Sequence, residues 1–318
     1  MTSGPNTASG EASDLVIDVQ GLTKIYGDKT VVDDFDLRVP RGSVYGFLGP
    51  NGSGKTTTIR MVCGLLTPNA GQGSCLGWDV IQQSDKIKAN VGYMTQKFSL
   101  WEDLTIKENL TFVARMYDVP DYRDRVAVAL DDLGLTARSN QLAGSLSGGW
   151  KQRLSLAACT IHGPKLLLLD EPTAGVDPRA RREFWENIHD LADRGVTILV
   201  STHYMDEAVQ CDSIAYIAYG KKLIDAPSRE IASRVGLYTW RAEGTGLSRV
   251  ASALKGQKGV EQVARFGTAL HVSGSDEAAL KAAIAPWQNS DGLRWTRREP
   301  GLEETFIHLM SKAEDNFK

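Results

Sequence analysis

Short apolar runs that alternate with amphipathic stretches predict an α/β chain. Val44–Leu48 has the composition of a short buried strand, and Leu166–Leu169 is an uninterrupted apolar run that suits a central parallel strand buried on both faces. In Ile106–Tyr117 and Arg123–Leu133, apolar residues recur every three or four positions, which is typical of amphipathic helices. These helices predict a lobe over about residues 97–164, apart from the sheet.

Near the start of the chain, apolar and polar residues alternate instead. Leu15–Val19 and Phe35–Val39 therefore predict strands with one buried face, as in an antiparallel β subdomain. A turn is expected at Thr23–Gly27, and a Gly-rich turn at Gly71 and Gly73.

The C-terminal part predicts a second domain over residues 238–318, after a first domain over residues 14–230. Its strands and helices follow a β-α-β-β-α-β order, which indicates a small ferredoxin-like α+β fold. The expected elements are Tyr238–Ala242, Leu247–Leu254, Val260–Phe266, Thr268–Val272, Asp276–Ile284 and Leu293–Arg297. Before them, Ser213–Tyr219 and Lys222–Ile224 predict a hairpin around Gly220.

Composition places the 318 residues among ordinary globular proteins of two domains, with 42% hydrophobic and 24% charged residues. The net charge of -3 argues against bulk nucleic-acid binding, which favours a basic face. No apolar run approaches the roughly 20 residues that span a bilayer. Residues 1–13 predict a disordered tail, not a secretory signal. The four dispersed cysteines indicate reduced thiols, not a disulfide framework or a zinc site.

The stretch from Gly49 to Thr57 fits the phosphate-loop pattern G-x-x-x-x-G-K-[ST], between a predicted strand and a predicted helix. We call it the phosphate loop; its residues are Gly49, Pro50, Asn51, Gly52, Ser53, Gly54, Lys55, Thr56 and Thr57. Such a loop directs backbone N–H groups and the positive end of a helix at an anion. Lys55 is expected to reach the β- and γ-phosphates, and the Thr56 hydroxyl to bind Mg²⁺.

Polar side chains follow two predicted buried strands. Asp170 and Glu171 end the Leu166–Leu169 run, and Thr202-His203 follows the strand Val196–Ser201. Ligands bind at this edge of open α/β sheets. We therefore expect Asp170 to hold Mg²⁺, Glu171 to orient and polarise the attacking water, and His203 to contact the γ-phosphate.

A second phosphate clamp is predicted at Ser147-Gly148-Gly149, which we call the signature. Ser147 suits the N-cap of an apolar-periodic helix that runs from Trp150 to Ala158. Glycines at the start of this helix expose N–H groups where the helix carries about half a positive charge. A Gly-containing helix start with no ligand is the alternative interpretation.

Taken in order, these motifs resemble the nucleotide-binding ATPases of ABC transporters over about residues 15–230. The matching positions are Tyr26, the phosphate loop, Gln96, Leu146 with the signature, Asp170-Glu171, Asp177 and His203. The family usually has Gln where this chain has Trp150. The resemblance implies a P-loop NTPase fold of ABC type with a mixed sheet core, an antiparallel β subdomain and a helical lobe. It also implies a head-to-tail dimer that sandwiches ATP between the phosphate loop of one subunit and the signature of the other.

The resemblance further implies roles for residues that the pattern alone leaves open. Tyr26 would stack on adenine, although an aromatic residue packing a strand end is the alternative. Gln96 would link metal and water to a membrane partner, and is otherwise a loop glutamine. Asp177 would cross the dimer interface, and otherwise caps a helix that begins at Pro178.

The sequence around these motifs resembles drug-resistance-type exporter ATPases, which pair with separate polytopic permeases of the type-2 exporter class. This implies an ATPase on the cytoplasmic face of the inner membrane that uses ATP and Mg²⁺ and dimerises with itself or a paralogue. Phe98, Leu100 and Trp101 are candidates for docking the permease, or else form a small core cluster. An importer ATPase with a regulatory C-terminal domain, and a soluble ABC ATPase acting on ribosomes or DNA, are the alternatives. The transported substrate is not encoded in this chain.

Overall fold

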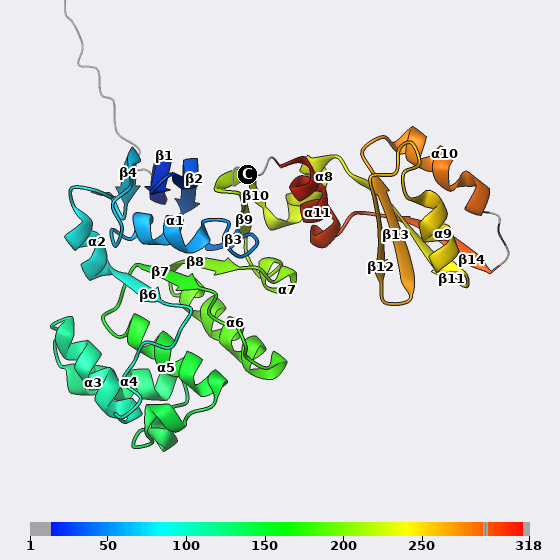
Figure 1. The fold of residues 1–318 in the computed structure, drawn as a ribbon. Helices are drawn as coiled ribbons and strands as arrows, with labels where there is room; N and C mark the ends of the chain where they lie inside the picture. The colour runs from blue at the N-terminus through cyan, green and yellow to red at the C-terminus, as the bar shows by residue number, and fades with distance from the viewer. Residues whose placement is uncertain (1–13, 289, 291, 314–318) are drawn as a thin grey trace, which may run out of the picture. The chain divides into compact units, whose positions relative to one another are not determined.

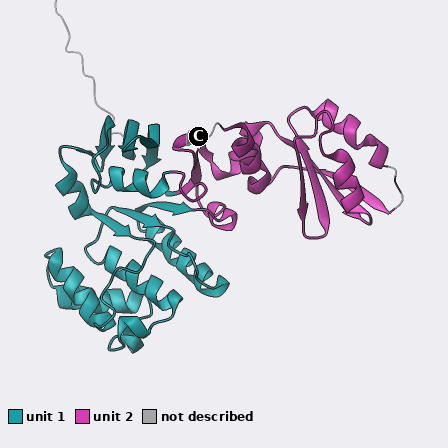
Figure 2. Ribbon diagram, viewed as in Figure 1, with its two compact units in different colours: residues 1–45, 54–202 teal, residues 46–53, 203–318 magenta. Residues whose placement is uncertain are grey.

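The computed structural model describes residues 14–288, 290 and 292–313, so the tail expected at residues 1–13 lies outside the described residues. The chain divides into two compact units (Figure 2). Unit 1 comprises residues 1–45 and 54–202, and unit 2 comprises residues 46–53 and 203–318. The domain boundary expected between residues 230 and 238 stays a prediction. Within the described ranges, no helix has both the length and the apolar character needed to cross a membrane.

An antiparallel sheet in the order β2-β1-β4-β5 forms one layer of unit 1 (Figure 1). The turn expected at Thr23–Gly27 lies later, at Gly27 and Asp28, because β1 runs through Thr23 to Tyr26. The strand absorbs an irregularity at Gly21, whose φ of 64° lies in the left-handed region, and its pairing with β2 then resumes. The strands span Leu15–Tyr26 (β1), Lys29–Pro40 (β2), Ala70–Cys75 (β4) and Trp78–Asp79 (β5).

The Gly-rich turn expected at Gly71 and Gly73 is wrong, because both glycines lie inside β4. They are required by the close approach of β1. A Cβ on Gly71 would lie 2.5 Å from the carbonyl oxygen of Gly21, and a Cβ on Gly73 would lie 2.3 Å from that of Asp18. In a sequence, glycine is compatible either with a turn or with a strand that another backbone approaches closely, and the local pattern does not distinguish the two.

Parallel strands form the buried core of unit 1, as the apolar runs predict. In unit 1, β7 pairs in parallel with β6 on one side and with β8 on the other. All four leucines of β7 are fully buried, and Asp170 pairs with Ser201 where β7 and β8 end. The helix α1 packs against β1, β2 and β7. These elements span Lys55–Val62 (α1), Val91–Met94 (β6), Leu166–Asp170 (β7) and Thr197–Thr202 (β8), and β3 spans Val44–Leu48.

The expected helical lobe is confirmed as a group of helices at the lower end of unit 1 (Figure 1). A capping box starts its first helix: the Thr105 hydroxyl accepts from the Glu108 N–H, and the Glu108 carboxylate accepts from the Thr105 N–H. The helices of unit 1 span Ser84–Asn90 (α2), Ile106–Met116 (α3), Tyr122–Asp132 (α4), Gly148–Thr160 (α5) and Pro178–Asp193 (α6), with short 3₁₀ turns at Thr136–Arg138 (η1) and Ala143–Ser145 (η2).

Unit 2 contains the expected hairpin and a four-stranded antiparallel sheet in the order β12-β13-β11-β14. In this order the second and third strands are adjacent and the first and fourth are adjacent, which confirms the ferredoxin-like prediction. The elements span Met205–Ala208 (α7), Ser213–Ala218 (β9), Lys221–Pro227 (β10), Ser228–Glu230 (η3), Ile231–Val235 (α8), Tyr238–Gly244 (β11), Leu247–Leu254 (α9), Gln262–Phe266 (β12), Ala269–Gly274 (β13), Glu277–Gln288 (α10), Leu293–Arg298 (β14) and Leu302–Lys312 (α11).

The two faces of this sheet pack against different helices. Leu270 and Val272 belong to the apolar cluster shared with α9 and α10. His271, between them, points to the other face, because side chains alternate along a strand. There its Nδ1 lies 2.5 Å from Oε1 of Glu304 on α11. The same helix stacks Phe306 on Tyr216 of β9 with ring centroids 4.3 Å apart, so α11 ties the small sheet to the hairpin within unit 2.

Candidate nucleotide-binding site

The first half of the phosphate loop belongs to unit 2 and is packed tightly there. A Cβ on Gly49 would lie 2.2 Å from the carbonyl oxygen of Ile217, so only glycine fits. The Gly220 N–H donates to the Ser53 carbonyl oxygen at 3.0 Å. The Ser53 hydroxyl is buried and has no hydrogen-bond partner within the described chain. A buried, unsatisfied hydroxyl in a glycine-rich loop fits an anionic ligand that would accept its hydrogen bond.

The second half of the loop starts α1 in unit 1. Gly54 is the N-cap with a φ of 107°, a conformation that glycine adopts without strain. Its carbonyl oxygen accepts from the N–H and the hydroxyl of Thr58, at 2.9 and 3.1 Å. Lys55, Thr56 and Thr57 form the first turn of the helix, at its positive end. The predicted strand–loop–helix context is therefore present.

The ammonium of Lys55 and the carboxylate of Glu171 meet across more than a hundred residues of chain. Nζ of Lys55 lies 3.4 Å from Oε1 of Glu171, and the two side chains are 4% and 8% exposed. Burial lowers the pKa of Lys55, and the Glu171 carboxylate opposes that shift through its charge and hydrogen bond. A phosphate group would offer Lys55 an alternative anionic partner.

The two residues expected to bind Mg²⁺ are also adjacent. The Thr56 hydroxyl donates to Oδ2 of Asp170 at 2.8 Å, and the Ser201 hydroxyl donates to Oδ1 at 2.6 Å. Mg²⁺ is usually held by one or two carboxylates together with substrate phosphates, so this donor set fits the ion. Ser201 belongs to none of the sequence motifs; its only sequence signal is its position at the end of a strand beside β7.

Glu171 is held in place from both its backbone and its side chain. Its φ of 48° lies in the left-handed region, which costs about 1–3 kcal/mol for a residue other than glycine and is often found at functional sites. Its N–H donates to the carbonyl oxygen of Ser201 at 3.0 Å and also contacts the hydroxyl at 3.1 Å. Gln96 Nε2 donates to Oε2 of Glu171 at 2.9 Å, which brings another predicted site residue to the same carboxylate.

The signature begins α5, as its sequence predicts. Ser147 is the N-cap, as the sequence predicts. Its side chain, however, makes no capping hydrogen bond. Gly148 and Gly149 are the first two residues of the helix, where N–H groups have no intrahelical partner. This hydroxyl and these N–H groups are the ones that the resemblance assigns to phosphate.

Three further predicted site residues make local contacts in the structure. These contacts do not test the roles expected for them, which stay predictions. Asp177 caps α6, and its Oδ1 accepts from the N–H groups of Arg179 and Ala180 at 3.1 and 3.0 Å. Tyr26 is 50% exposed at the end of β1, with the Lys24 ammonium 5.4 Å from its ring centroid. His203 is the first residue of unit 2 after β8, and its ring lies 4.1 Å from that of Tyr204.

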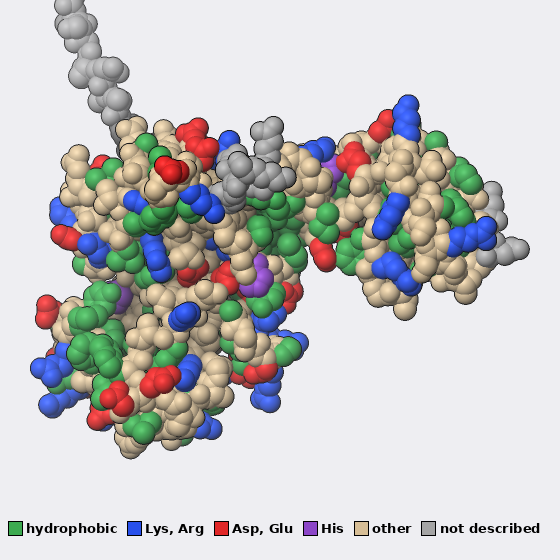
Figure 3. Space-filling view, in the orientation of Figure 1, with side chains coloured by type: hydrophobic (Ala, Val, Ile, Leu, Met, Phe, Trp, Pro, Cys, Tyr) green, Lys and Arg blue, Asp and Glu red, His purple; other side chains and the backbone are tan. Residues whose placement is uncertain are grey.

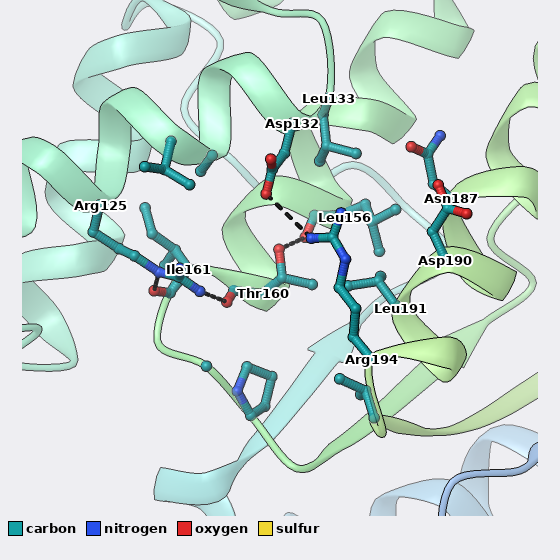
Figure 4. Close-up of a pocket in the computed structure, with 15 residues that line it drawn as sticks. Arg125, Asp132, Leu133, Leu156, Thr160, Ile161, Asn187, Asp190, Leu191 and Arg194 are labelled. Carbon is teal, nitrogen blue, oxygen red and sulfur yellow. Dashed lines mark hydrogen bonds and ion pairs between the residues drawn. The ribbon is translucent and has the colours of Figure 1, made fainter.

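A cavity of about 280 Å³ lies between α4, the end of α5 and α6 in unit 1 (Figure 4). Arg125 donates to the Ile161 carbonyl oxygen at 3.0 Å, and Arg194 pairs with Asp132 at 3.5 Å across its lining. None of the predicted site residues lines this cavity. The candidate site is thus the polar cluster around Glu171, and not this cavity.

Comparisons with known proteins point to the same family as the sequence motifs. The family model for the ABC transporter matches residues 32–174. The daunorubicin/doxorubicin resistance ATP-binding protein DrrA of Streptomyces peucetius is 38% identical over 315 residues, which cover 94% of both chains. The probable multidrug ABC transporter ATP-binding protein YbhF of Escherichia coli (strain K12) is 43% identical over 218 residues. That match covers 68% of this chain and only 38% of YbhF.

Solved structures agree with this comparison. The structure of cbiO1 from Clostridium perfringens, part of the ABC transporter complex cbiONQ, has a TM-score of 0.64 and 26% identity, and the match covers 69% of this chain and 91% of that one. The structure of an ATP-binding subunit of an ABC transporter has a TM-score of 0.63 and 28% identity over 70% of this chain and 93% of that one.

Proposed function

The chain belongs to the ABC transporter family as one of its ATP-binding proteins, which are ATPases, and from that premise we propose that it powers an exporter through a separate membrane permease. The observation that supports the ATP-hydrolysing part of this proposal is the cluster in which Lys55 and Gln96 both contact the carboxylate of Glu171. A lysine for phosphate, a carboxylate for water and a glutamine that touches this carboxylate are the groups that ATP hydrolysis needs at one place.

In the proposed mechanism, two copies close head to tail on two ATP molecules. The phosphate loop of one copy holds the triphosphate, and Ser147 with the N–H groups of Gly148 and Gly149 binds it from the other copy. Thr56, Asp170 and Gln96 would hold Mg²⁺, which would neutralise charge on the phosphates when bound. Most of the rate enhancement then comes from positioning and charge stabilisation.

Lys55 and Glu171 exchange partners when ATP binds. In the structure they contact each other. The γ-phosphate competes for Lys55, so that the Glu171 carboxylate can accept a proton from the attacking water. Its strained backbone, anchored on Ser201, keeps the carboxylate at the end of β7 during this change. His203 contacts the γ-phosphate, and Tyr26 stacks on the adenine.

An apolar patch on the helical lobe supports the proposal of a membrane partner. Figure 3 shows hydrophobic side chains gathered over the helical lobe of unit 1. The exposed apolar residues there include Trp101, Phe112 and Met116, which are 43%, 45% and 61% exposed and which we call the lobe patch. Trp101 and Phe112 pack edge to face with ring centroids 4.3 Å apart. A permease docked on this patch would place the ATPase on the cytoplasmic face of the inner membrane.

Co-purification from detergent-solubilised membranes tests the proposed partner. A polytopic membrane protein should accompany the chain, and Phe112→Ser with Met116→Ser should release it. Val128→Ser, which changes a residue of α4 that is 47% exposed and outside the lobe patch, should retain it. Recovery of ribosomes or DNA in place of a membrane protein would overturn the exporter proposal.

A further inference from the structure

The third residue of the signature helix is a tryptophan held by two arginines. The guanidinium of Arg138 lies 4.7 Å from the centroid of the Trp150 ring, and that of Arg153 lies 5.0 Å from it. Both distances are within the range of attractive cation–π contacts, for which tryptophan is the best aromatic partner. The ring is only partly exposed. Trp150 thus fixes the side chain of Arg153, one turn further along α5.

Arg153 continues this contact to the next helix. Its Nη2 lies 2.5 Å from Oε2 of Glu183 on α6, and its Nη1 donates to the Leu133 carbonyl oxygen at 3.2 Å. Oε1 of the same glutamate accepts from Nε of Arg179 at 3.1 Å. Charged side chains therefore connect Trp150 to the first turn of α6, the helix that Asp177 caps.

The two helix starts also pack against each other. A Cβ on Gly149 would lie 2.8 Å from the Cβ of Ala180, in the first turn of α6. The carboxylate of Asp177 fixes the N–H of Ala180. The second glycine of the signature thus packs directly on the turn that follows Asp177, and the side-chain network around Trp150 lies beside this contact.

We propose that Trp150 is a positioning residue that locks the signature to the start of α6, so that Ser147 and Asp177 approach the second subunit as one rigid element. This inference rests on the proposed function, because both ends of the element belong to the ATP-dependent interface. Without the ring, Arg153 loses one of its contacts and the first turn of α5 gains freedom, which must be lost again when the dimer closes. The tryptophan therefore favours association and leaves nucleotide binding by one subunit unchanged.

The test measures ATP-driven dimerisation in a Glu171→Gln background, which slows hydrolysis. At saturating ATP, Trp150→Leu should raise the protein concentration at half-dimerisation by roughly five- to thirtyfold, the range that one or two cation–π contacts supply. Trp150→Phe keeps a ring and should recover part of the loss. Binding of a fluorescent ADP analogue to dilute monomer should stay within about twofold in all variants.

Tyr122→Leu is the matched control, since Tyr122 on α4 is an aromatic residue flanked by Arg115 and Arg123, each 5.9 Å from its ring. It should dimerise like the background protein. Glu183→Gln removes the charge partner of Arg153 without altering the core and should weaken association in the same way. Its effect should not add fully to that of Trp150→Leu. If the background protein dimerises but Trp150→Leu and Glu183→Gln both match it, the positioning role is wrong; if the background protein itself stays monomeric, the proposed function fails first.

Discussion

The Lys55 ammonium lies 3.4 Å from Oε1 of Glu171, and each side chain is more than nine-tenths buried. The residue expected to bind phosphate and the residue expected to activate water therefore form a buried ion pair. A buried charge without a partner is costly, whereas a buried pair can often be replaced by neutral groups at little cost. The ammonium thus compensates the buried charge of Glu171, so removing it alone should be costly.

This relationship predicts the effect of Lys55→Met on stability. Removing the ammonium takes the ion-pair partner from the buried carboxylate of Glu171, and the free energy of unfolding should fall by about 3 kcal/mol in urea denaturation without nucleotide. The double variant Lys55→Met, Glu171→Gln leaves no unpaired charge and should recover most of that loss. If the double variant is as unstable as Lys55→Met, the loss does not come from an uncompensated charge on Glu171. ATP affinity of the single variant, measured by calorimetry, should drop at least about tenfold.

Glu171→Gln is expected to separate binding from hydrolysis. The amide keeps the shape of the carboxylate and can still contact Gln96, but it cannot accept a proton from water. The hydrolysis rate, followed by phosphate release, should fall by about 10²–10⁴ with the ATP dissociation constant nearly unchanged. Turnover equal to that of the unaltered protein would remove Glu171 from the catalytic role.

The close packing of α5 on α6 predicts a difference between the two signature glycines. Gly149→Ala would place its Cβ 2.8 Å from that of Ala180, whereas a Cβ on Gly148 has its nearest neighbour 4.0 Å away. Overpacking of this kind costs about 1–3 kcal/mol, so Gly149→Ala should lower the free energy of unfolding by that amount and Gly148→Ala by less. Equal loss in both variants, measured by urea denaturation, would contradict the packing of the two helices.

We predict that the environment of His308 on α11 makes the free energy of unfolding depend on pH. Its Nδ1 lies 2.8 Å from Oε2 of Glu261, yet burial, together with the charge of Lys312, holds its pKa below the ordinary value of 6.5 despite the opposing effect of Glu261. The unfolded chain therefore binds the proton more readily, and stability falls as the pH drops through 6.5 towards the lowered pKa. The unfolding free energy should be lower at about pH 5.5 than at about pH 7.5, by no more than about 1.4 kcal/mol, the limit for one proton over one pH unit. His308→Gln should remove this part of the slope; an unchanged slope would contradict it.

Much of the architecture follows from local patterns. The leucine run of β7, the amphipathic repeats of α3 and α4, and the strand order of the C-terminal sheet all depend on residues close in sequence. The errors at Gly71 and Gly73 arise because a neighbouring strand, and not the local chain, requires glycine there. Ser201 was missed for a similar reason, since its role comes from the alignment of β8 with β7. The network around Trp150 joins residues from η1 to α6 and has no motif of its own.

The central claim is that one ATP binds between the phosphate loop of one subunit and the signature of another. Sedimentation of the Glu171→Gln variant with ATP tests this claim most directly. The account predicts a dimer that holds two nucleotides and that dissociates when Ser147→Arg is added, while the monomer still binds ATP. A Glu171→Gln protein that sediments as a monomer with ATP bound would contradict it.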